Sequence, residues 1–139
     1  MNRTRHVSEI MSRELVFLRP DDSLKRAREL LSRAHVHHLP VVDDGNRLVG
    51  IISDRDVSSQ LSPFVDTPSE RDQDRWSLRR RVDSVMSADP VTIEDTDSVR
   101  HAARLMLAEG VSCLPIVDPA GVLVGLVTSN DLLHVLAAD

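Results

Sequence analysis

Cysteine is almost absent from this sequence, since Cys113 is the only one among 139 residues. One thiol excludes a framework of internal disulfides, and no secretory signal opens the chain, so we expect a protein of the reducing cytoplasm. No apolar run approaches the ~18 residues that a membrane-spanning helix requires. The sequence therefore predicts no contact with a membrane.

Aromatic residues are also scarce, at 2% of the chain, and the formal net charge at pH 7 is −5. Proteins that bind nucleic acids usually concentrate basic charge, and those that bind single strands stack the bases on aromatic side chains. Because both features are missing, we expect no nucleic-acid partner. The apolar residues left to build a core are mainly Val, Leu, Ile and Ala.

The second half of the chain repeats the first. After a shift of 75 residues, "HLPVVD" falls on "CLPIVD" and "RLVGIIS" falls on "VLVGLVT" without a gap. Self-similarity at a fixed period indicates a duplicated structural unit. We expect a first repeat at 1–60, a linker at 61–81 and a second repeat at 82–139, which together form one module.

Each copy shows the same order of secondary-structure signals. Helical lead-ins, "VSEIM" and "VDSVM", precede the extended pieces "LVFL" and "PVTI", and Asp22 and Asp97 then stand where a helix N-cap is expected. An amphipathic helix, two apolar runs joined by "DGN" or "PAG", and a closing helix from Asp54 or Ser129 follow. The predicted fold class is α/β (α+β), with two β-α-β-β-α repeats. A copy of about 50 residues is marginal alone, so we expect the two to pack sheet to sheet.

Residues 58–81, between the copies, have no sustained period and are typical of a surface excursion that ends in a helical turn, "DRWSLRRR". Within this segment, Trp76 is either a local hydrophobic anchor or an exposed contact for a partner. The arginine run 79–81 is either a solvated face or a contact for phosphate or an acidic partner.

A hydroxyl followed three residues later by a carboxylate closes the second apolar run of each copy. Ser53 and Asp56 form this pattern in the first copy, and Thr128 and Asp131 form it in the second. The pattern is typical of a capping box, which satisfies the first N–H groups of a helix. A carboxylate placed there also accepts hydrogen bonds from both hydroxyls of a ribose, while the free N–H groups attract phosphate. The two roles are compatible, and their repetition favours ligand contact.

Together these patterns resemble a known family. The pair "MSRELVFL…HLPVVDDGNRLVGIISDRDV" and "MSADPVTI…CLPIVDPAGVLVGLVTSNDL" is similar to the tandem CBS domain, named after cystathionine β-synthase. The resemblance implies two repeats with pseudo-twofold symmetry and two clefts that bind AMP, ADP, ATP, S-adenosylmethionine or NAD. It also implies a disc-like homodimer. Because the repeats and their connector fill almost the whole chain, we expect the signal to pass to a separate, unknown effector protein.

The predicted ligand site takes residues from both copies. Apolar walls for adenine come from "HLPV" and "CLPI", and the resemblance adds the extended pieces and implies that each motif faces the lead-in of the other repeat, so that each cleft is composite. Only the first copy offers basic residues at the site, so we expect a polyphosphate to prefer its cleft. The predicted ligand-binding residues are Leu15, Val16, His37, His38, Pro40, Ser53, Arg55, Asp56, Pro90, Val91, Ser112, Cys113, Pro115, Thr128, Asn130 and Asp131.

Other chemistries have less support. His35, His37 and His38 with Cys113 lack the spacing of a metal site, and the strand context of Cys113 indicates a buried residue and not a nucleophile. No phosphate-loop motif occurs, so we expect no catalytic residues, no metal, no cofactor and no enzyme activity. Two functions stay open: a sensor of adenine nucleotides, and a structural dimerisation module with degenerate clefts.

Overall fold

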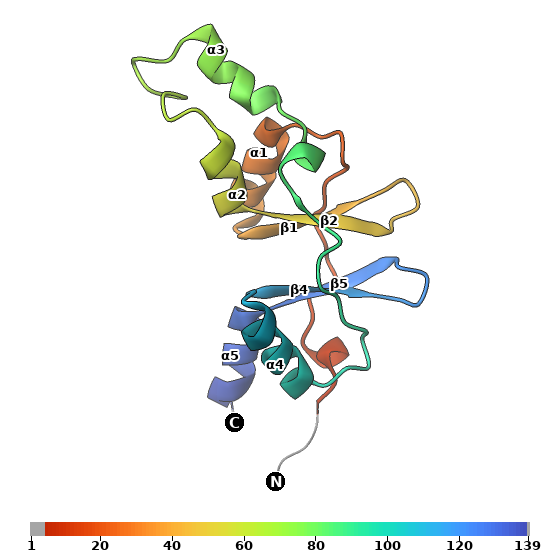
Figure 1. Ribbon diagram of the computed structural model, residues 1–139. Helices are drawn as coiled ribbons and strands as arrows, with labels where there is room; N and C mark the ends of the chain where they lie inside the picture. The colour runs from red at the N-terminus through yellow and green to blue at the C-terminus, as the bar shows by residue number, and fades with distance from the viewer. Residues whose placement is uncertain (1–4, 139) are drawn as a thin grey trace. The chain divides into compact units, whose positions relative to one another are not determined.

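The computed structural model describes residues 5–138, which form two compact units (Figure 1). Unit 1 contains the described residues of 5–15, 45–48 and 90–138, and unit 2 contains 16–44 and 49–89. Residues 1–4 and 139 of the predicted repeats lie outside the described residues. Each unit therefore combines segments from both sequence repeats.

Unit 2 is built on the sheet β1-β2-β3, against which the first copy's helices pack. β2 pairs antiparallel with β3, with Gly50 opposite Ala88 and Ile51 opposite Ser87. The core is aliphatic and includes Leu24, Leu39 and Ile52. Its elements are α1 (Leu24–Ala34), β1 (His38–Val42), β2 (Leu48–Ser53), α2 (Asp54–Gln60), α3 (Asp72–Arg75), the 3-10 helices η2 (Trp76–Arg79) and η3 (Val82–Ser84), and β3 (Ser87–Ala88).

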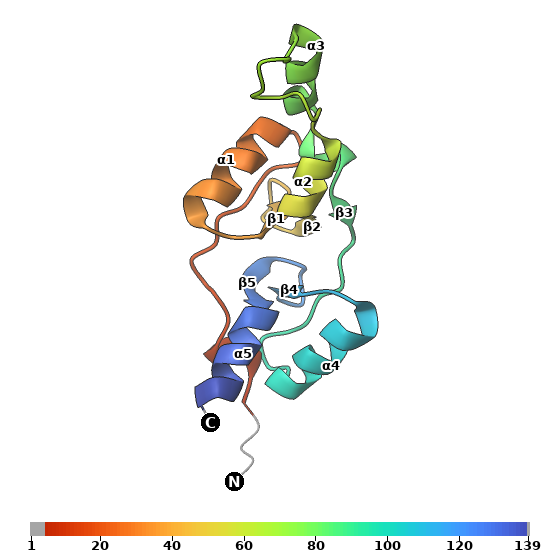
Figure 2. The ribbon, with the colours of Figure 1, turned by 90° about the vertical axis from the view of Figure 1, so that its left-hand side faces the viewer.

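Unit 1 repeats this plan around the β4-β5 hairpin (Figure 2). The two strands pair antiparallel from Cys113 opposite Thr128 to Val117 opposite Leu123, with an irregularity between Ile116 and Val117. Its core is again aliphatic. The elements are η1 (Val7–Glu9), α4 (Val99–Glu109), β4 (Cys113–Val117), β5 (Leu123–Thr128) and α5 (Ser129–Ala138). The predicted α+β class, with two matching copies, is confirmed.

The two helical lead-ins are exchanged between the copies. The lead-in η1 of the first copy packs in unit 1, where the Val7 N–H donates to the Asp97 carbonyl at 2.8 Å. Ser12 and Leu126 exchange both backbone hydrogen bonds, at 2.9 and 3.2 Å. In unit 2, the Val82 N–H of the second lead-in donates to the Asp22 carbonyl at 2.7 Å. Neither copy therefore completes its core without a segment of the other.

A methionine of each exchanged lead-in lies on a glycine of the "LVG" strand. A Cβ built on Gly125 would lie 2.6 Å from the Met11 sulfur, and one built on Gly50 would overlap the Met86 side chain. Both glycines follow a Leu-Val pair in their strands. The repeated glycine is thus explained by close packing and not by a turn.

The extended pieces are shorter than the sequence predicts. Only Leu18 and Ile93 form parallel bridges, to Val41 and Ile116 respectively. The Leu18 N–H donates to the Pro40 carbonyl at 2.9 Å, and the Ile93 N–H donates to the Pro115 carbonyl at 3.1 Å. Each piece is therefore tied to the first strand of its own copy but does not extend into a regular strand.

The predicted N-caps are wrong by one residue. Ser23 and Ser98 cap α1 and α4, with their hydroxyl oxygens accepting from the Arg26 and His101 N–H groups at 3.1 and 2.9 Å. The carboxylate of Asp22 instead accepts from the Arg19 N–H, at 2.7 Å. Asp97 does the same with the Glu94 N–H, at 2.8 Å. The aspartates thus accept hydrogen bonds within the turn that precedes each helix, and the serines that follow them cap the helices.

The segment between the copies is ordered and carries the predicted helical turn, as α3 and η2. Ser62 connects the start of this segment to α3 and η2. Its hydroxyl donates to Asp74 at 2.7 Å, and its N–H donates to the Ser77 hydroxyl at 3.1 Å. Leu78 is its buried anchor. Trp76 is 61% exposed, so the interpretation as an anchor is wrong for this residue.

Among residues 5–138, no helix is both long enough and apolar enough to cross a membrane.

Gly125→Ala is expected to lower the free energy of unfolding by about 1–3 kcal/mol, because overpacking forces side chains and backbone to shift. The added Cβ would meet the Met11 side chain and also the Ser12 carbonyl oxygen, at 3.2 Å. Chemical denaturation measures the change. Gly50→Ala is the matched variant, and its loss should be smaller because the three atoms nearest its Cβ all belong to the flexible Met86 side chain. A Gly125→Ala protein as stable as wild type would contradict the packing described here.

Candidate functional site

The first hydroxyl–carboxylate motif lies where β2 passes directly into α2. The Asp56 N–H donates to the Ser53 hydroxyl oxygen at 3.0 Å, and the Ser53 N–H donates to Oδ2 of Asp56 at 2.9 Å. The two residues therefore form a reciprocal capping box. Both side chains are half-buried.

The second motif repeats this geometry between β5 and α5. The Thr128 N–H donates to Oδ2 of Asp131 at 2.8 Å, and the Thr128 hydroxyl donates to the same oxygen at 3.1 Å. The Asp131 N–H lies 3.3 Å from the Thr128 hydroxyl oxygen. The capping interpretation is thus confirmed at both junctions.

The cap engages only one oxygen of each carboxylate. Within residues 5–138, Oδ2 receives the hydrogen bonds of the cap, and none reaches Oδ1 of Asp56 or Asp131. A carboxylate has about four lone-pair sites, so a capped aspartate keeps capacity for further donors. The cap also fixes where that free oxygen lies.

In both copies the start of the first strand lies beside the motif. The Asp54 N–H donates to the His37 carbonyl at 2.9 Å, and the Ser129 N–H donates to the Ser112 carbonyl at 2.8 Å. The next residues, His38 and Cys113, begin β1 and β4. The structure thus brings the "HLP" and "CLP" segments to the same junctions as the predicted carboxylates.

Two histidines and Asp54 give the first junction its electrostatics. Nδ1 of His37 lies 2.7 Å from Oδ2 of Asp54, and this hydrogen bond holds the pKa of the Asp54 carboxyl below its usual value. Burial lowers the pKa of His38, against the opposing influence of Asp54 and with a further lowering by His37. This lowered pKa favours the neutral form of His38. Sequence reasoning missed Asp54, although an acidic residue at the start of a helix is a common signal.

At the second junction Cys113 replaces His38 and is buried. Burial, followed by the nearby Asp131 carboxylate, raises the pKa of its thiol to about 12. A thiol with this pKa stays protonated near neutral pH, so it lacks the thiolate that a nucleophile or metal ligand requires. The expectation that Cys113 packs as a small apolar residue is confirmed.

The remaining predicted residues are divided between the units. Val16, which is exposed, lies in unit 2 with Ser53 and Asp56, whereas Leu15 lies in unit 1. Pro90 and Val91 lie in unit 1 with Thr128 and Asp131. Pro40 and Pro115 are buried within their strands. Arg55 and Asn130 are exposed in the first turns of α2 and α5.

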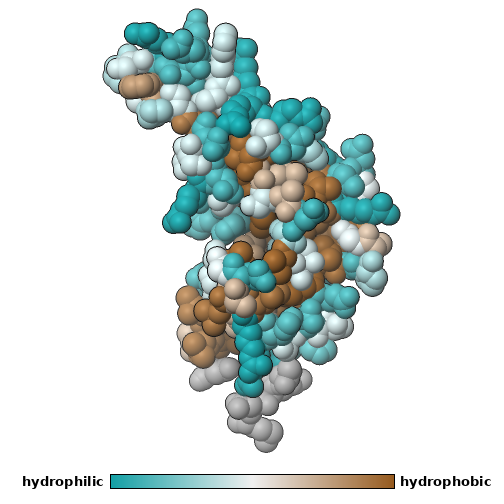
Figure 3. Space-filling view, viewed as in Figure 1, coloured by the Kyte–Doolittle hydropathy of each residue, from teal (hydrophilic) through white to brown (hydrophobic). Residues whose placement is uncertain are grey.

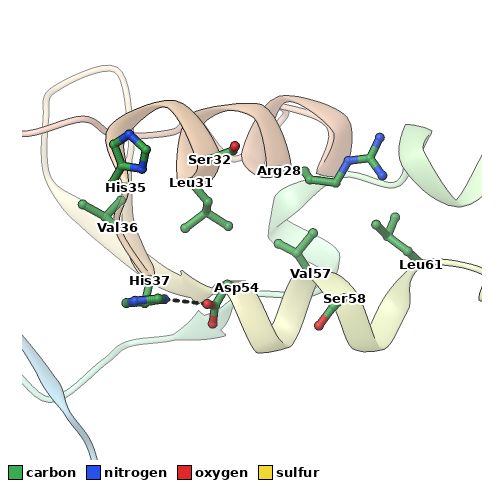
Figure 4. Close-up of a pocket in the computed structure, with 10 residues that line it drawn as sticks. All are labelled: Arg28, Leu31, Ser32, His35, Val36, His37, Asp54, Val57, Ser58 and Leu61. Carbon is green, nitrogen blue, oxygen red and sulfur yellow. Dashed lines mark hydrogen bonds and ion pairs between the residues drawn. The ribbon is translucent and has the colours of Figure 1, made fainter. Parts of the chain in front are cut away.

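Sequence reasoning also missed a groove of about 540 Å³ between α1 and α2 (Figure 4). Leu31 and Val57 point into it from the two helices, and His37 is the only predicted ligand residue among those that line it. Ser32 of α1 and Ser58 of α2 are also among the residues that line it. The lining residues are Arg28, Leu31, Ser32, His35, Val36, His37, Asp54, Val57, Ser58 and Leu61.

In the part of the chain that the structure describes, no three His, Cys, Asp or Glu side chains are grouped so that they could hold a metal ion.

Comparison with known proteins identifies the class that this fold and these two junctions define. The family model for the CBS domain matches residues 7–62 and 82–138. A CBS domain-containing protein of Dictyostelium discoideum is 41% identical over 133 residues, which cover 94% of this chain and 90% of that protein. The chain belongs to the CBS domain family, and it carries two copies of the domain.

Solved structures of CBS domain pairs share the fold. The CBS domain pair of protein MJ0100, in complex with 5-methylthioadenosine and S-adenosyl-L-methionine, has a TM-score of 0.83 at 25% identity, with 98% of each chain covered. CBSX2 in complex with AMP has a TM-score of 0.80 at 28% identity, with 96% of each chain covered.

Several other relatives are much longer than this chain, which matches only 21–24% of their length. One of them is the L-aspartate semialdehyde sulfurtransferase of Methanocaldococcus jannaschii, which is 27% identical over 126 residues; these cover 91% of this chain and 22% of the enzyme.

His38 should make the stability of the protein sensitive to mild acid. Its pKa is lowered in the folded protein, so the unfolded chain binds the proton more tightly, and stability falls as pH drops below the unfolded value of about 6.5. We expect His38→Gln to show a smaller loss of stability between pH 7 and pH 5 than wild type, measured by urea denaturation. His101→Gln, a change at an exposed histidine of α4, is the control. Equal pH dependence in His38→Gln and wild type would contradict the assigned burial effect.

Proposed function

We propose that this protein is a regulatory module that binds adenosine-containing ligands at the two strand–helix junctions. The observation that carries the proposal is the pair of capped carboxylates, Asp56 and Asp131, to which the described residues donate hydrogen bonds only at Oδ2. Charge-assisted hydrogen bonds to a vicinal diol are stronger than neutral ones, which suits a ribose. The proposed contacts of the ligand are the residues of both copies that the sequence predicts to bind it.

The solved relatives support the ligand class. Two CBS domain pairs of the same fold are known in complex with AMP, or with S-adenosylmethionine and 5-methylthioadenosine. All three ligands contain adenosine, whose ribose and adenine are the groups that the junction would recognise. We therefore propose AMP, ADP, ATP, S-adenosylmethionine or NAD as the candidate ligands.

The exchanged lead-ins support a composite cleft at each junction. In unit 1, the first copy's lead-in is bonded through Ser12 to Leu126, two residues before Thr128. In unit 2, Met86 of the second lead-in lies on Gly50, three residues before Ser53. Each cleft is thus proposed to use segments of both repeats, with the repeats bounded as 1–60 and 82–139 about a linker.

The proposed function also includes how the module assembles and how it passes its signal to another protein. We propose a homodimer that acts in the cytoplasm and passes ligand occupancy to an effector, without catalysis of its own. Such coupling requires that the ligand bind one arrangement of the module more tightly than another. Exposed leucines on α4 and α5 also favour the second candidate, a dimerisation module whose clefts bind nothing.

Asp56→Asn and Asp131→Asn together should weaken binding of AMP roughly tenfold or more, because a lost charge-assisted hydrogen bond costs ~1.5–3 kcal/mol. Asparagine keeps a side-chain oxygen for the cap but removes the charge and one acceptor. Isothermal titration with the adenosine ligands measures the affinity.

Ser53→Ala with Thr128→Ala is the matched control, since it removes the cap hydroxyls and leaves the carboxylates. We expect it to cost about 1 kcal/mol of stability per cap but to change affinity less than the asparagine pair. A wild-type protein that binds none of these ligands would favour the dimerisation module instead.

Among the basic residues predicted at the first junction, Arg55 is the one we expect to contact a phosphate chain. His37 is hydrogen-bonded to Asp54, and burial lowers the pKa of His38, which favours its neutral form. We expect Arg55→Ala to weaken ATP binding roughly tenfold while adenosine binding changes little, because only the phosphates gain from the guanidinium. Asn130→Ala is the matched change at the second junction and should weaken ATP binding less than Arg55→Ala does, because asparagine carries no charge for the phosphates. Equal affinity of Arg55→Ala and wild type for ATP would refute the role of Arg55.

A further inference from the structure

The arginine run of the segment between the copies lies beside the start of α1. The Leu24 N–H donates to the Arg80 carbonyl at 2.9 Å, and Ser23 forms an antiparallel bridge with Arg81. The first turn of α1 adds two more basic side chains at this place. The exposed basic residues that meet there are Lys25, Arg26, Arg79 and Arg80, which we call the basic surface.

The positive charge of the basic surface is not compensated within the fold. Among residues 5–138, no carboxylate forms an ion pair with any of its four side chains. Arg80 donates to the side-chain oxygen of Gln60, an amide that carries no charge. Asp83 pairs with Arg81 at 2.8 Å, and the charge of Asp21 also acts on that guanidinium. A concentration of unpaired cations is thus present on a chain whose formal net charge is −5.

An exposed aromatic side chain stands next to this charge. Trp76 and Arg79 are the first and last residues of η2, and side chains three residues apart in a 3-10 helix lie on the same face. Leu78 of the same helix is buried and η2 packs against α1, so the fold holds η2 in place while Trp76 stays 61% exposed. Figure 3 shows mostly teal, hydrophilic atoms over the segment that contains α3 and η2.

The equivalent place in the second copy lacks this combination. The backbone pairing is the same, since the Val99 N–H donates to the Arg5 carbonyl at 2.8 Å. The residues equivalent to Lys25 and Arg26, 75 positions later, are Arg100 and His101, and Trp76 is the only tryptophan of the chain. The pairing of tryptophan with arginine is therefore a property of the segment between the copies and not of the repeated fold.

We propose that the basic surface and Trp76 together bind an acidic peptide segment of another protein, in which carboxylates flank an apolar residue. Guanidinium groups form strong, often bidentate hydrogen bonds with carboxylates. Tryptophan supplies a large apolar contact with few rotatable bonds, and Trp and Arg are enriched among the residues that dominate protein–protein binding energies. Charge complementarity thus defines the chemistry of the partner.

A nucleic acid is the competing polyanion. Proteins that bind single strands stack successive bases on several aromatic side chains, whereas this surface offers Trp76. A long polyanion would also extend from the basic surface over a protein of net negative charge, which repels it. A short acidic peptide contacts the basic surface without meeting this repulsion.

This inference rests on the separate effector of the proposed function and states the chemistry of its contact. The helix α2 begins after the Ser53–Asp56 cap and ends at Gln60, whose side chain accepts from Arg80. The basic surface therefore adjoins the end of α2 that lies away from the cap. Because the two places share no residue, ligand binding and peptide binding are measured independently.

The test titrates the 139-residue protein with a synthetic peptide of eight glutamates around two central leucines. Trp76 is the only tryptophan, so its fluorescence reports contact directly, and we expect the emission to shift to shorter wavelength as the ring leaves water. Lys25→Glu with Arg79→Glu should raise the dissociation constant roughly tenfold or more, because reversed charges repel the peptide. Isothermal titration should show a loss of similar size for Trp76→Ala. Thermal unfolding checks that these exposed changes leave the fold intact.

The matched control is Arg100→Glu with Arg104→Glu on α4, two exposed positions that change the net charge by the same amount. We expect its affinity for the peptide to stay within about twofold of wild type, since its charges lie outside the basic surface. A wild type that does not bind the peptide, or a control that loses as much affinity as the surface variant, overturns the proposal. Tighter binding of a ten-residue oligouridine than of the peptide also overturns it. Titration of the same samples with AMP judges the sensor separately, because AMP binding without peptide binding refutes this inference alone.

Discussion

The reciprocal capping box at each strand–helix junction, in which the backbone N–H of each of two residues donates to the side chain of the other, is the constraint on which this structure's functional interpretation depends. Ser53 with Asp56, and Thr128 with Asp131, use one carboxylate oxygen to start a helix. The same bonds hold the other oxygen in a fixed place. Capping and ligand contact are therefore two uses of one arrangement, because the cap orders a carboxylate that would otherwise rotate freely.

Duplication explains why the arrangement occurs twice and also why neither copy can stand alone. Each lead-in packs on the other copy's hairpin, where Met11 and Met86 occupy the space above Gly125 and Gly50. The glycines are thus required by a contact between repeats. In this exchange, the segment that precedes one repeat packs next to the strand–helix junction of the other repeat.

Much of the fold was predictable, because apolar periodicity and the shift of 75 residues locate each helix and hairpin. The N-caps were misassigned by one residue, since both aspartate and serine suit that position and only tertiary contacts choose Ser23 and Ser98. At the site, the Ser53 and Thr128 motifs were found from spacing. The groove between α1 and α2 and the partnership of His37 with Asp54 were not, because they depend on how two helices pack and on a side-chain rotamer.

The most direct measurement of the central claim is a crystal structure of the protein grown with AMP. The account predicts that the ribose hydroxyls lie within about 3 Å of Oδ1 of Asp56 or Asp131, while Oδ2 keeps its bonds to the cap. A structure in which both carboxylates bond only to their own caps, with the nucleotide absent or held elsewhere, would contradict it.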